Sequence, residues 1–169
     1  MPQVTLLRAT RADSPELIAG FLASREQHHP WAAPFTDEAG FDAWFGRGLT
    51  GPLVGLVARE PVSGGVVGLV SLGRIVFTPF SRSATLGYSG MAALAGRGLM
   101  TEAVRLAAAH AFGELGLYRL EANIGPRNAR SIALVQRLGF RLEGLAPRYG
   151  RLDGVWHDVE RWALLADEA

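Results

Sequence analysis

The sequence predicts an α/β (α+β) domain built on a mixed, twisted sheet, and three observations support this. Two Val-rich apolar runs, 51–60 and 64–77, flank a Pro-Val-Ser-Gly-Gly turn, which is typical of a β-hairpin with a longer loop. Apolar residues recur every three or four positions over 99–115, which is typical of a helix with one buried face. From residue 83 onward strand and helix patterns alternate, and a right-handed strand–helix–strand crossover makes its two strands parallel.

The first segment predicts a strand over 4–8 followed by a helix. Ser14 is the expected N-cap, with Pro15 in the first helical position and Glu16 in the first turn. This helix is expected to end near Arg25.

A second helix is predicted in the segment "TDEAGFDAWFGRG". Thr36 is its expected cap, and one face carries Phe41, Trp44 and Phe45. The segment between the two helices, 28–35, contains two prolines that break the helical pattern.

The second half is expected to contain the crossover units. Alternating apolar and polar residues over 118–124 are typical of a strand, and Gly139 is a suitable stop for the helix before it. The predicted elements are a strand at 83–91, a helix at 99–115, a strand at 118–124, a helix from Asn128 to Gly139, and strands at 140–144 and 155–165.

Length, charge and composition restrict the class of protein. A chain of 169 residues fits a single domain, 1–169, and a formal net charge of +1 gives no basic excess of the kind that binds nucleic acid. There is no cysteine, which excludes disulfides, thiolate nucleophiles and Cys-type zinc sites. The N-terminal segment lacks the apolar run of a signal peptide, and no apolar stretch is long enough to cross a membrane. We therefore expect a cytoplasmic protein.

The turn Gly96-Arg97-Gly98 lies directly before the strongest predicted helix. The first turn of a helix has free N–H groups and the positive end of the helix dipole, and glycines let a phosphate approach the backbone closely. The pattern predicts a site for an anion such as a pyrophosphate, with Arg97 adding charge at its rim. The alternative is that the glycines only make a tight turn. The segment has neither the Gly-Lys-Ser/Thr of a Walker loop nor the third glycine of a dinucleotide fingerprint.

A series of motifs follows in a fixed order: "LGYS", "GRGLMTEA", "RLEA", "PRNARS", "LGF" and "LEG", with "REQHHPW" upstream and "RYGRLDGVWHD" downstream. Together they resemble the GNAT superfamily of acetyl-CoA-dependent N-acetyltransferases. More narrowly, they resemble its RimJ/RimL branch, which acetylates protein N-termini.

The resemblance implies the GNAT fold, in which helices flank the central sheet and acetyl-CoA binds where two parallel strands splay apart. It places the CoA pyrophosphate on backbone amides of the glycine-rich turn and helix start, which by position are Leu94, Gly96, Arg97, Gly98 and Leu99. The wider superfamily often has Gln or Arg three residues before the first glycine. Ala93 occupies that place here, so binding is expected to depend on the backbone.

Asn128 and Ser131 are three residues apart at a predicted helix start, which puts both side chains on one face. From the residues alone, Asn128 is an N-cap and Ser131 a polar residue of the first turn. The resemblance assigns the Asn to CoA binding and the Ser to the departing sulfur, as hydrogen-bond donor or acid. Both interpretations are compatible.

The general base is less defined. Glu121 lies within a predicted strand, where an acidic residue is poorly suited, and some members of the superfamily use a carboxylate on this strand. The alternative for Glu121 is a salt bridge with a neighbouring Arg. Gly150 stands where RimL relatives carry a second proposed base. Tyr149 beside it is expected to line the amine pocket or donate a hydrogen bond, or else to pack as an ordinary aromatic residue.

Two histidines lie in the early segment, which overhangs the acceptor site in this fold. His28 and His29 either contact the substrate or lie on the surface without a functional role, and both alternatives stay open. Trp31 either closes the core or forms a wall of a cleft. The four scattered histidines predict no metal site.

The resemblance implies transfer of an acetyl group from acetyl-CoA to a primary amine, and it is the resemblance that favours the α-amino group of a ribosomal-type protein. Without cysteine, the predicted route is direct transfer in a ternary complex. An α-amine has a pKa of about 8, so little help from a general base is needed to form the neutral amine. The alternatives are a small-molecule acceptor (antibiotic, polyamine or toxin) and a CoA-binding module without turnover. The chain is expected to be a monomer or homodimer that does not contact nucleic acid or membrane.

Overall fold

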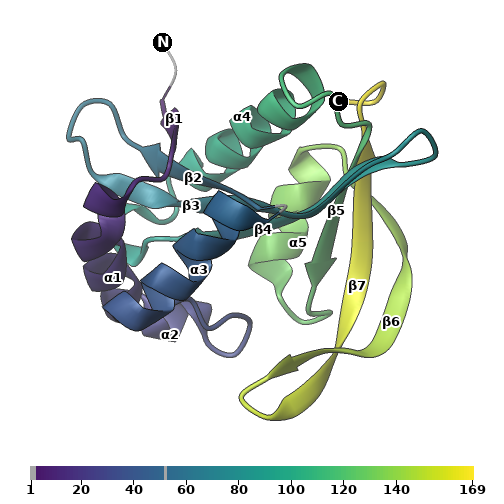
Figure 1. Ribbon diagram of the computed structural model, residues 1–169. Helices are drawn as coiled ribbons and strands as arrows, with labels where there is room; N and C mark the ends of the chain where they lie inside the picture. The colour runs from purple at the N-terminus through teal and green to yellow at the C-terminus, as the bar shows by residue number, and fades with distance from the viewer. Residues whose placement is uncertain (1–2, 52) are drawn as a thin grey trace.

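The computed structural model describes residues 3–51 and 53–169 and confirms a mixed sheet with helices against it (Figure 1). The strands of these described residues form one sheet in the order β1-β2-β3-β4-β5-β7-β6. The strands are β1 Thr5–Arg8, β2 Val54–Arg59, β3 Val66–Phe77, β4 Arg82–Gly90, β5 Arg119–Ile124, β6 Arg141–Leu152 and β7 Val155–Leu165. The helices are η1 Arg11–Asp13, α1 Ser14–Ala23, α2 Arg25–His28, α3 Glu38–Thr50, η2 Ala92–Leu94, α4 Leu99–Gly113 and α5 Ala129–Arg137.

The two crossovers differ in where their strands come to lie. β4 and β5 pair in parallel around α4, as predicted. β5 and β6 run in the same direction around α5, but they are not neighbours, because β7 pairs antiparallel with both. The hairpin of β6 and β7 brings the chain back to the free edge of β5. The sequence pattern predicted the direction of β6 correctly but did not reveal β7 between the two strands.

β6 is longer than predicted, since 140–144 is only its beginning. The residues after Gly144 include Pro147 and Gly150, which are typical of a loop. β6 is the last strand of the sheet, where a proline is tolerated, and register shifts at Leu142/Gly144 and Ala146/Gly150 accommodate the irregular segment.

Helices cover both faces of the sheet and bury two apolar clusters. α4 and α5 enclose the larger one, which includes Val104, Leu120 and Val135. α1 and α3 enclose the other, which includes Phe21 and Phe41. In Figure 1 α1 and α3 lie on the side of the sheet opposite α4 and α5. In the described part of the chain, none of the helices has the length and apolar character that a membrane span requires.

The first two long helices begin differently from the prediction. Asp13, rather than Ser14, is the cap residue of α1, because the chain already turns in η1, where the Asp13 carboxylate accepts from the backbone N–H and hydroxyl of Thr10 at 2.7 and 2.9 Å. The Ser14 hydroxyl instead donates to Glu38 at 2.6 Å. Asp37, not Thr36, caps α3, with its carboxylate accepting from the N–H of Gly40 at 2.7 Å.

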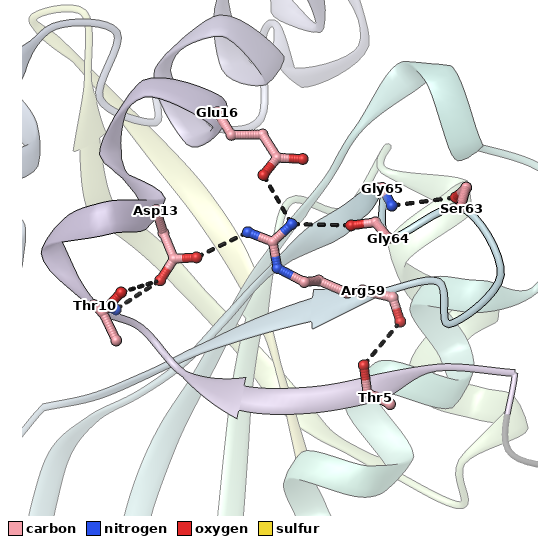
Figure 2. A network of polar contacts seen from close by, with 8 residues as sticks. All are labelled: Thr5, Thr10, Asp13, Glu16, Arg59, Ser63, Gly64 and Gly65. Atoms are coloured by element: carbon pink, nitrogen blue, oxygen red, sulfur yellow. Dashed lines mark hydrogen bonds and ion pairs between the residues drawn. The ribbon is translucent and has the colours of Figure 1, made fainter.

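A polar network ties α1 to β2, as Figure 2 shows. Arg59 donates to Asp13 at 2.8 Å, to Glu16 at 2.8 Å and to the carbonyl of Gly64 at 2.9 Å. Burial alone would raise the pKa of Asp13, but hydrogen bonds from Thr10 and Arg59 outweigh it and lower that pKa. The network thus fastens the first helix to β2 and to the β2–β3 loop.

Candidate active site

A cavity of about 560 Å³ opens beside the end of β4. Its walls come from α2 and the residues after it, from the last residues of β4, from the turn and first residues of α4, and from α5. Segments from both faces of the sheet therefore meet at one opening. This volume lies within the range of small-molecule and cofactor sites.

The cavity lies where the two parallel strands separate. β4 and β5 pair only from Ser83↔Arg119 to Thr85↔Glu121, yet β4 continues to Gly90 and β5 to Ile124. Beyond the paired stretch β4 continues along β3, and β5 continues along β7. This is the splayed arrangement that the sequence resemblance implied.

The N-terminus of α4 forms one wall of the cavity. Gly98 is its N-cap, with a φ of 76°, and Gly96 has a φ of 78°, both in the left-handed region that favours glycine. A Cβ on either glycine would meet no atom within 4 Å, so the space above them is open. The first N–H groups of α4 have no partner inside the helix, and residues 98–101 line the cavity. Such a start suits an anion, and Leu94 and Leu99 line the same cavity.

Arg97 is arranged differently from its neighbours. It does not line the cavity, and its guanidinium forms an ion pair with Glu60 in the β2–β3 loop. Glu60 also accepts from the Ser63 hydroxyl at 2.5 Å, and these hydrogen bonds, from Ser63 first and then from Arg97, lower the pKa of Glu60. The charge predicted at the rim of the anion site is thus partly neutralised.

The start of α5 forms the facing wall. The side-chain oxygen of Asn128 accepts from the N–H of Ser131 at 3.2 Å, which confirms Asn128 as the N-cap. Both residues line the cavity. The structure thus brings together Asn128, Ser131 and most of the predicted CoA-binding residues of the α4 start, although these segments are about thirty positions apart in the chain.

Tyr88 was not among the predicted site residues, although it lies in the "LGYS" motif that contributed to the resemblance. It lines the cavity, and its hydroxyl oxygen lies 2.8 Å from the hydroxyl oxygen of Ser131. Burial raises the pKa of Tyr88, and the hydrogen bond with Ser131 opposes that rise. Tyr88 therefore stays a neutral phenol at neutral pH.

Glu121 and Tyr149 lie outside the cavity wall. Glu121 projects from β5 and forms ion pairs with Arg119 at 2.8 Å and Arg161 at 3.4 Å, which matches the salt-bridge alternative. The Tyr149 hydroxyl accepts from Arg74 at 3.0 Å. These contacts hold both side chains to arginines rather than to Ser131.

The early segment forms the remaining wall. His28 is buried, with 7% of its surface exposed, and its Nε2 lies 2.8 Å from the carbonyl oxygen of Gly90, to which Gln27 also donates at 3.0 Å. Trp31 lines the cavity, and a Cβ on Gly125 would lie 3.1 Å from its indole ring. His28 and Trp31 are therefore part of the site, whereas His29 is exposed and lies outside its wall.

The donor set of the cavity fits an acyl-CoA better than a metal ion. Within residues 3–51 and 53–169 no group of three or more His, Asp or Glu side chains is placed to hold a metal. The helix starts offer backbone N–H groups for phosphates, and Asn128 and Ser131 offer neutral polar groups. The open space at Gly96 and Gly98 leaves the backbone accessible to such a ligand.

Comparison with known proteins defines the family. The family model "Acetyltransferase (GNAT) domain" matches residues 3–141. The chain belongs to the GNAT acetyltransferase family. This match confirms the GNAT fold and the resemblance found in the sequence. Members of this family use acetyl-CoA.

Curated relatives support the RimJ-like branch. The chain is 41% identical over 100 residues to the probable N-acetyltransferase YjcK of Bacillus subtilis, which covers 59% of this chain and 55% of that protein. It is 35% identical over 105 residues to the [ribosomal protein uS5]-alanine N-acetyltransferase of Escherichia coli, covering 62% and 54%. The chain thus spans about half the length of the curated relatives it matches.

Solved structures match over nearly the whole chain. Mycobacterium smegmatis RimJ in complex with CoA-disulfide superposes with a TM-score of 0.86 at 28% identity, covering 98% of this chain and 83% of that one. Spermidine N-acetyltransferase from Vibrio cholerae, in complex with CoA and spermine, superposes with a TM-score of 0.83 at 20% identity, covering 98% and 97%. The second likeness shows the shared fold alone.

Proposed function

We propose that this GNAT chain transfers an acetyl group from acetyl-CoA to the N-terminal α-amine of a protein, of the ribosomal type. The observation that carries the proposal is the meeting of two helix starts, at Gly98 and at Ser131, on one cavity where β4 and β5 separate. One start suits the pyrophosphate and the other suits the reacting thioester. Residues 1–169 act in this proposal as one acetyltransferase domain, as a monomer or homodimer.

Acetyl-CoA binding uses backbone groups more than charged side chains. Leu94, Gly96, Gly98 and Leu99 border the pyrophosphate, which accepts hydrogen bonds from the first turn of α4. Asn128, which lines the facing wall, contributes to CoA binding in this proposal. Arg97 contributes to phosphate binding only when its ion pair with Glu60 is broken, since that pair occupies its guanidinium.

Direct transfer requires a neutral amine, a stabilised oxyanion and a stabilised thiolate. A substrate α-amine with a pKa of about 8 loses its proton to water near neutral pH, so the proposal needs no charged base in the cavity. Glu121 and Tyr149 then serve the sheet and its hairpin through their contacts with arginines. Ser131 donates a hydrogen bond to the sulfur as the C–S bond breaks.

A curated relative supports the choice of acceptor. The Escherichia coli relative is named for the alanine of ribosomal protein uS5, which supports an α-amine acceptor, and a ribosomal acceptor would place the reaction in the cytoplasm. A polyamine stays the second candidate as one of the small-molecule acceptors left open by the sequence, and the Vibrio cholerae spermidine acetyltransferase is similar in fold. At 20% identity it adds no weight beyond the fold.

The test compares two peptides that differ only in the amine offered. One has a free N-terminal Ala, and the other is N-terminally blocked and carries an internal Lys. Release of CoA thiol is followed for each with acetyl-CoA. The proposal expects release only with the free N-terminus. Release only with the lysine peptide overturns the α-amine assignment. Release with neither peptide but with spermidine favours the small-amine function, and release with none of these supports a module without turnover.

A further inference from the structure

Tyr88 and Ser131 meet across the wall of the cavity. Tyr88 comes from β4 and Ser131 from the first turn of α5, and their hydroxyl oxygens are 2.8 Å apart. Asn128 separately holds the backbone N–H of Ser131. The helix start is thus fixed without Tyr88, and the contact between the hydroxyls decides where their protons point.

Two arrangements of the protons are possible. If Ser131 donates to Tyr88, its only proton is used inside the pair, and the acceptor that the protein then offers to the Tyr88 proton is the Ser131 carbonyl at 3.4 Å. That distance exceeds the usual range of about 2.5–3.0 Å for O–H···O bonds. If Tyr88 donates to Ser131 Oγ, the pair makes its short bond and the Ser131 proton stays available.

The chemistry of the two hydroxyls favours the second arrangement. A phenol is more acidic than an alkyl alcohol, so it is the stronger donor and the weaker acceptor of the pair. Burial, which raises the pKa of Tyr88, keeps that donor protonated at neutral pH. Ser131 lines the cavity, so its hydroxyl proton can then be donated to a group bound there.

We propose that Tyr88 is a positioning residue, which donates to Ser131 Oγ and thereby turns the Ser131 proton toward the sulfur of the departing CoA. This rests on the proposed function, which places a thiolate in the cavity. When the tetrahedral intermediate collapses, the C–S bond breaks and its electron pair moves onto sulfur. Ser131 donates a hydrogen bond to that thiolate, and both residues keep their protons. The C–N bond has formed by then, so the nitrogen gives its extra proton to water as the amide appears, and the thiolate takes one proton from water.

The pKa of the bound CoA thiol tests this without any acceptor amine. The thiolate absorbance of the CoA complex is recorded against pH, with the desulfo-CoA complex as the blank that cancels tyrosine titration. We expect the wild-type protein to hold this pKa below that of free CoA titrated in the same buffer. Tyr88→Phe and Ser131→Ala should each raise it by about one unit, a tenfold change in the ionisation equilibrium. The double variant should match Ser131→Ala, because Tyr88 acts through Ser131.

Turnover gives the second readout. Tyr88→Phe should lower kcat about tenfold and leave the Kd for acetyl-CoA within about twofold, since the lost bond acts mainly on the leaving group. Tyr118→Phe is the matched control, because Tyr118 is 48% exposed and lies outside the cavity wall, and it should behave as wild type. Melting temperatures confirm that each variant is folded.

The outcomes separate this inference from the proposed function. An unchanged thiol pKa in Tyr88→Phe, or effects of the two single variants that add in the double variant, overturns the role of Tyr88. A lowered thiol pKa that depends on both hydroxyls, in a protein that acetylates no amine, supports the pair and overturns only the transfer function.

Discussion

The imidazole Nε2 of His28 lies 2.8 Å from the carbonyl oxygen of Gly90, and this contact ties α2 to the last residue of β4. A carbonyl only accepts, so His28 has its proton on Nε2 in this contact. The imidazole also packs edge-to-face against Phe21, with ring centroids 5.7 Å apart. The early helical segment is therefore anchored at the strand end that borders the cavity.

Replacing His28 by Ala should destabilise the fold by about 2 kcal/mol, because a buried ring and its hydrogen bond are both lost. Gln27 still donates to the Gly90 carbonyl, which keeps the loss from being larger. Urea unfolding measures the change. Glu26→Ala, at an exposed position of the same helix, should change stability by less than about 0.5 kcal/mol. Equal losses in the two variants would show that His28 does not anchor the segment.

Gly98→Val should raise the Kd for acetyl-CoA by at least about tenfold. The residue at the α4 N-cap has a φ of 76°, which is strained by about 1–2 kcal/mol for a residue with a Cβ, and the new side chain would enter the open space at the helix start. Isothermal titration calorimetry gives the Kd. Gly113→Val, at the last residue of the same helix and also in open space, is the control and should bind as wild type. Unchanged binding by Gly98→Val contradicts the phosphate site.

Glu60→Gln should strengthen acetyl-CoA binding by about threefold, a change within the range of surface ion pairs. The substitution removes the charge that pairs with Arg97, so the guanidinium becomes available to the phosphates. Arg97→Gln alone should change the Kd by less than about twofold, and the gain from Glu60→Gln should disappear when Arg97 is also replaced. Titrations at low and high salt measure both effects. Weaker binding by Glu60→Gln would contradict this competition.

Asp13→Asn should cost about 1–2 kcal/mol of unfolding free energy at about pH 7, because Arg59 loses its most buried partner. The folded pKa of Asp13 lies below its ordinary value of 3.8, so its carboxylate stabilises the fold above that value and loses this effect as the pH falls through the folded pKa. The difference between variant and wild type should therefore shrink toward about pH 3. Urea unfolding over this range measures it.

Glu16→Gln is the comparison for this prediction. Glu16 also bonds Arg59, but its side chain is 49% exposed, so the loss should stay below about 1 kcal/mol at every pH. A constant Asp13→Asn penalty from neutral to acidic pH would mean that the charge of Asp13 does not matter.

Much of the fold was predictable because its signals are local. The alternation of 118–124 and the periodicity of 99–115 predicted β5 and α4 directly, and Asn128 is the cap that the sequence indicated. Capping at Ser14 and Thr36 was wrong for two reasons. Asp13 holds the cap position of α1 because the chain already turns in η1, where its carboxylate bonds Thr10, and Asp37 caps α3 by accepting from Gly40. Local patterns identify a helix more reliably than its first residue.

The site was predictable where a helix start carries the chemistry. Gly98 and Ser131 each follow from a motif next to a predicted helix, and the structure places both on one cavity. Tyr88 was not selected, and the role of His28 was left open, because their roles arise from contacts with Ser131 and Gly90 across the fold. Nothing in the local sequence distinguishes a tyrosine that faces a serine from one that packs on the surface, as Tyr149 does beside Arg74.

The most direct test of the central claim is a competition in one reaction. A peptide with a free N-terminal Ala and an internal Lys is incubated with the protein, acetyl-CoA and spermidine, and tandem mass spectrometry locates the acetyl group. The proposed function predicts acetylation of the peptide α-nitrogen before the lysine or the polyamine is modified. Acetyl found first on spermidine or on the lysine side chain would contradict it.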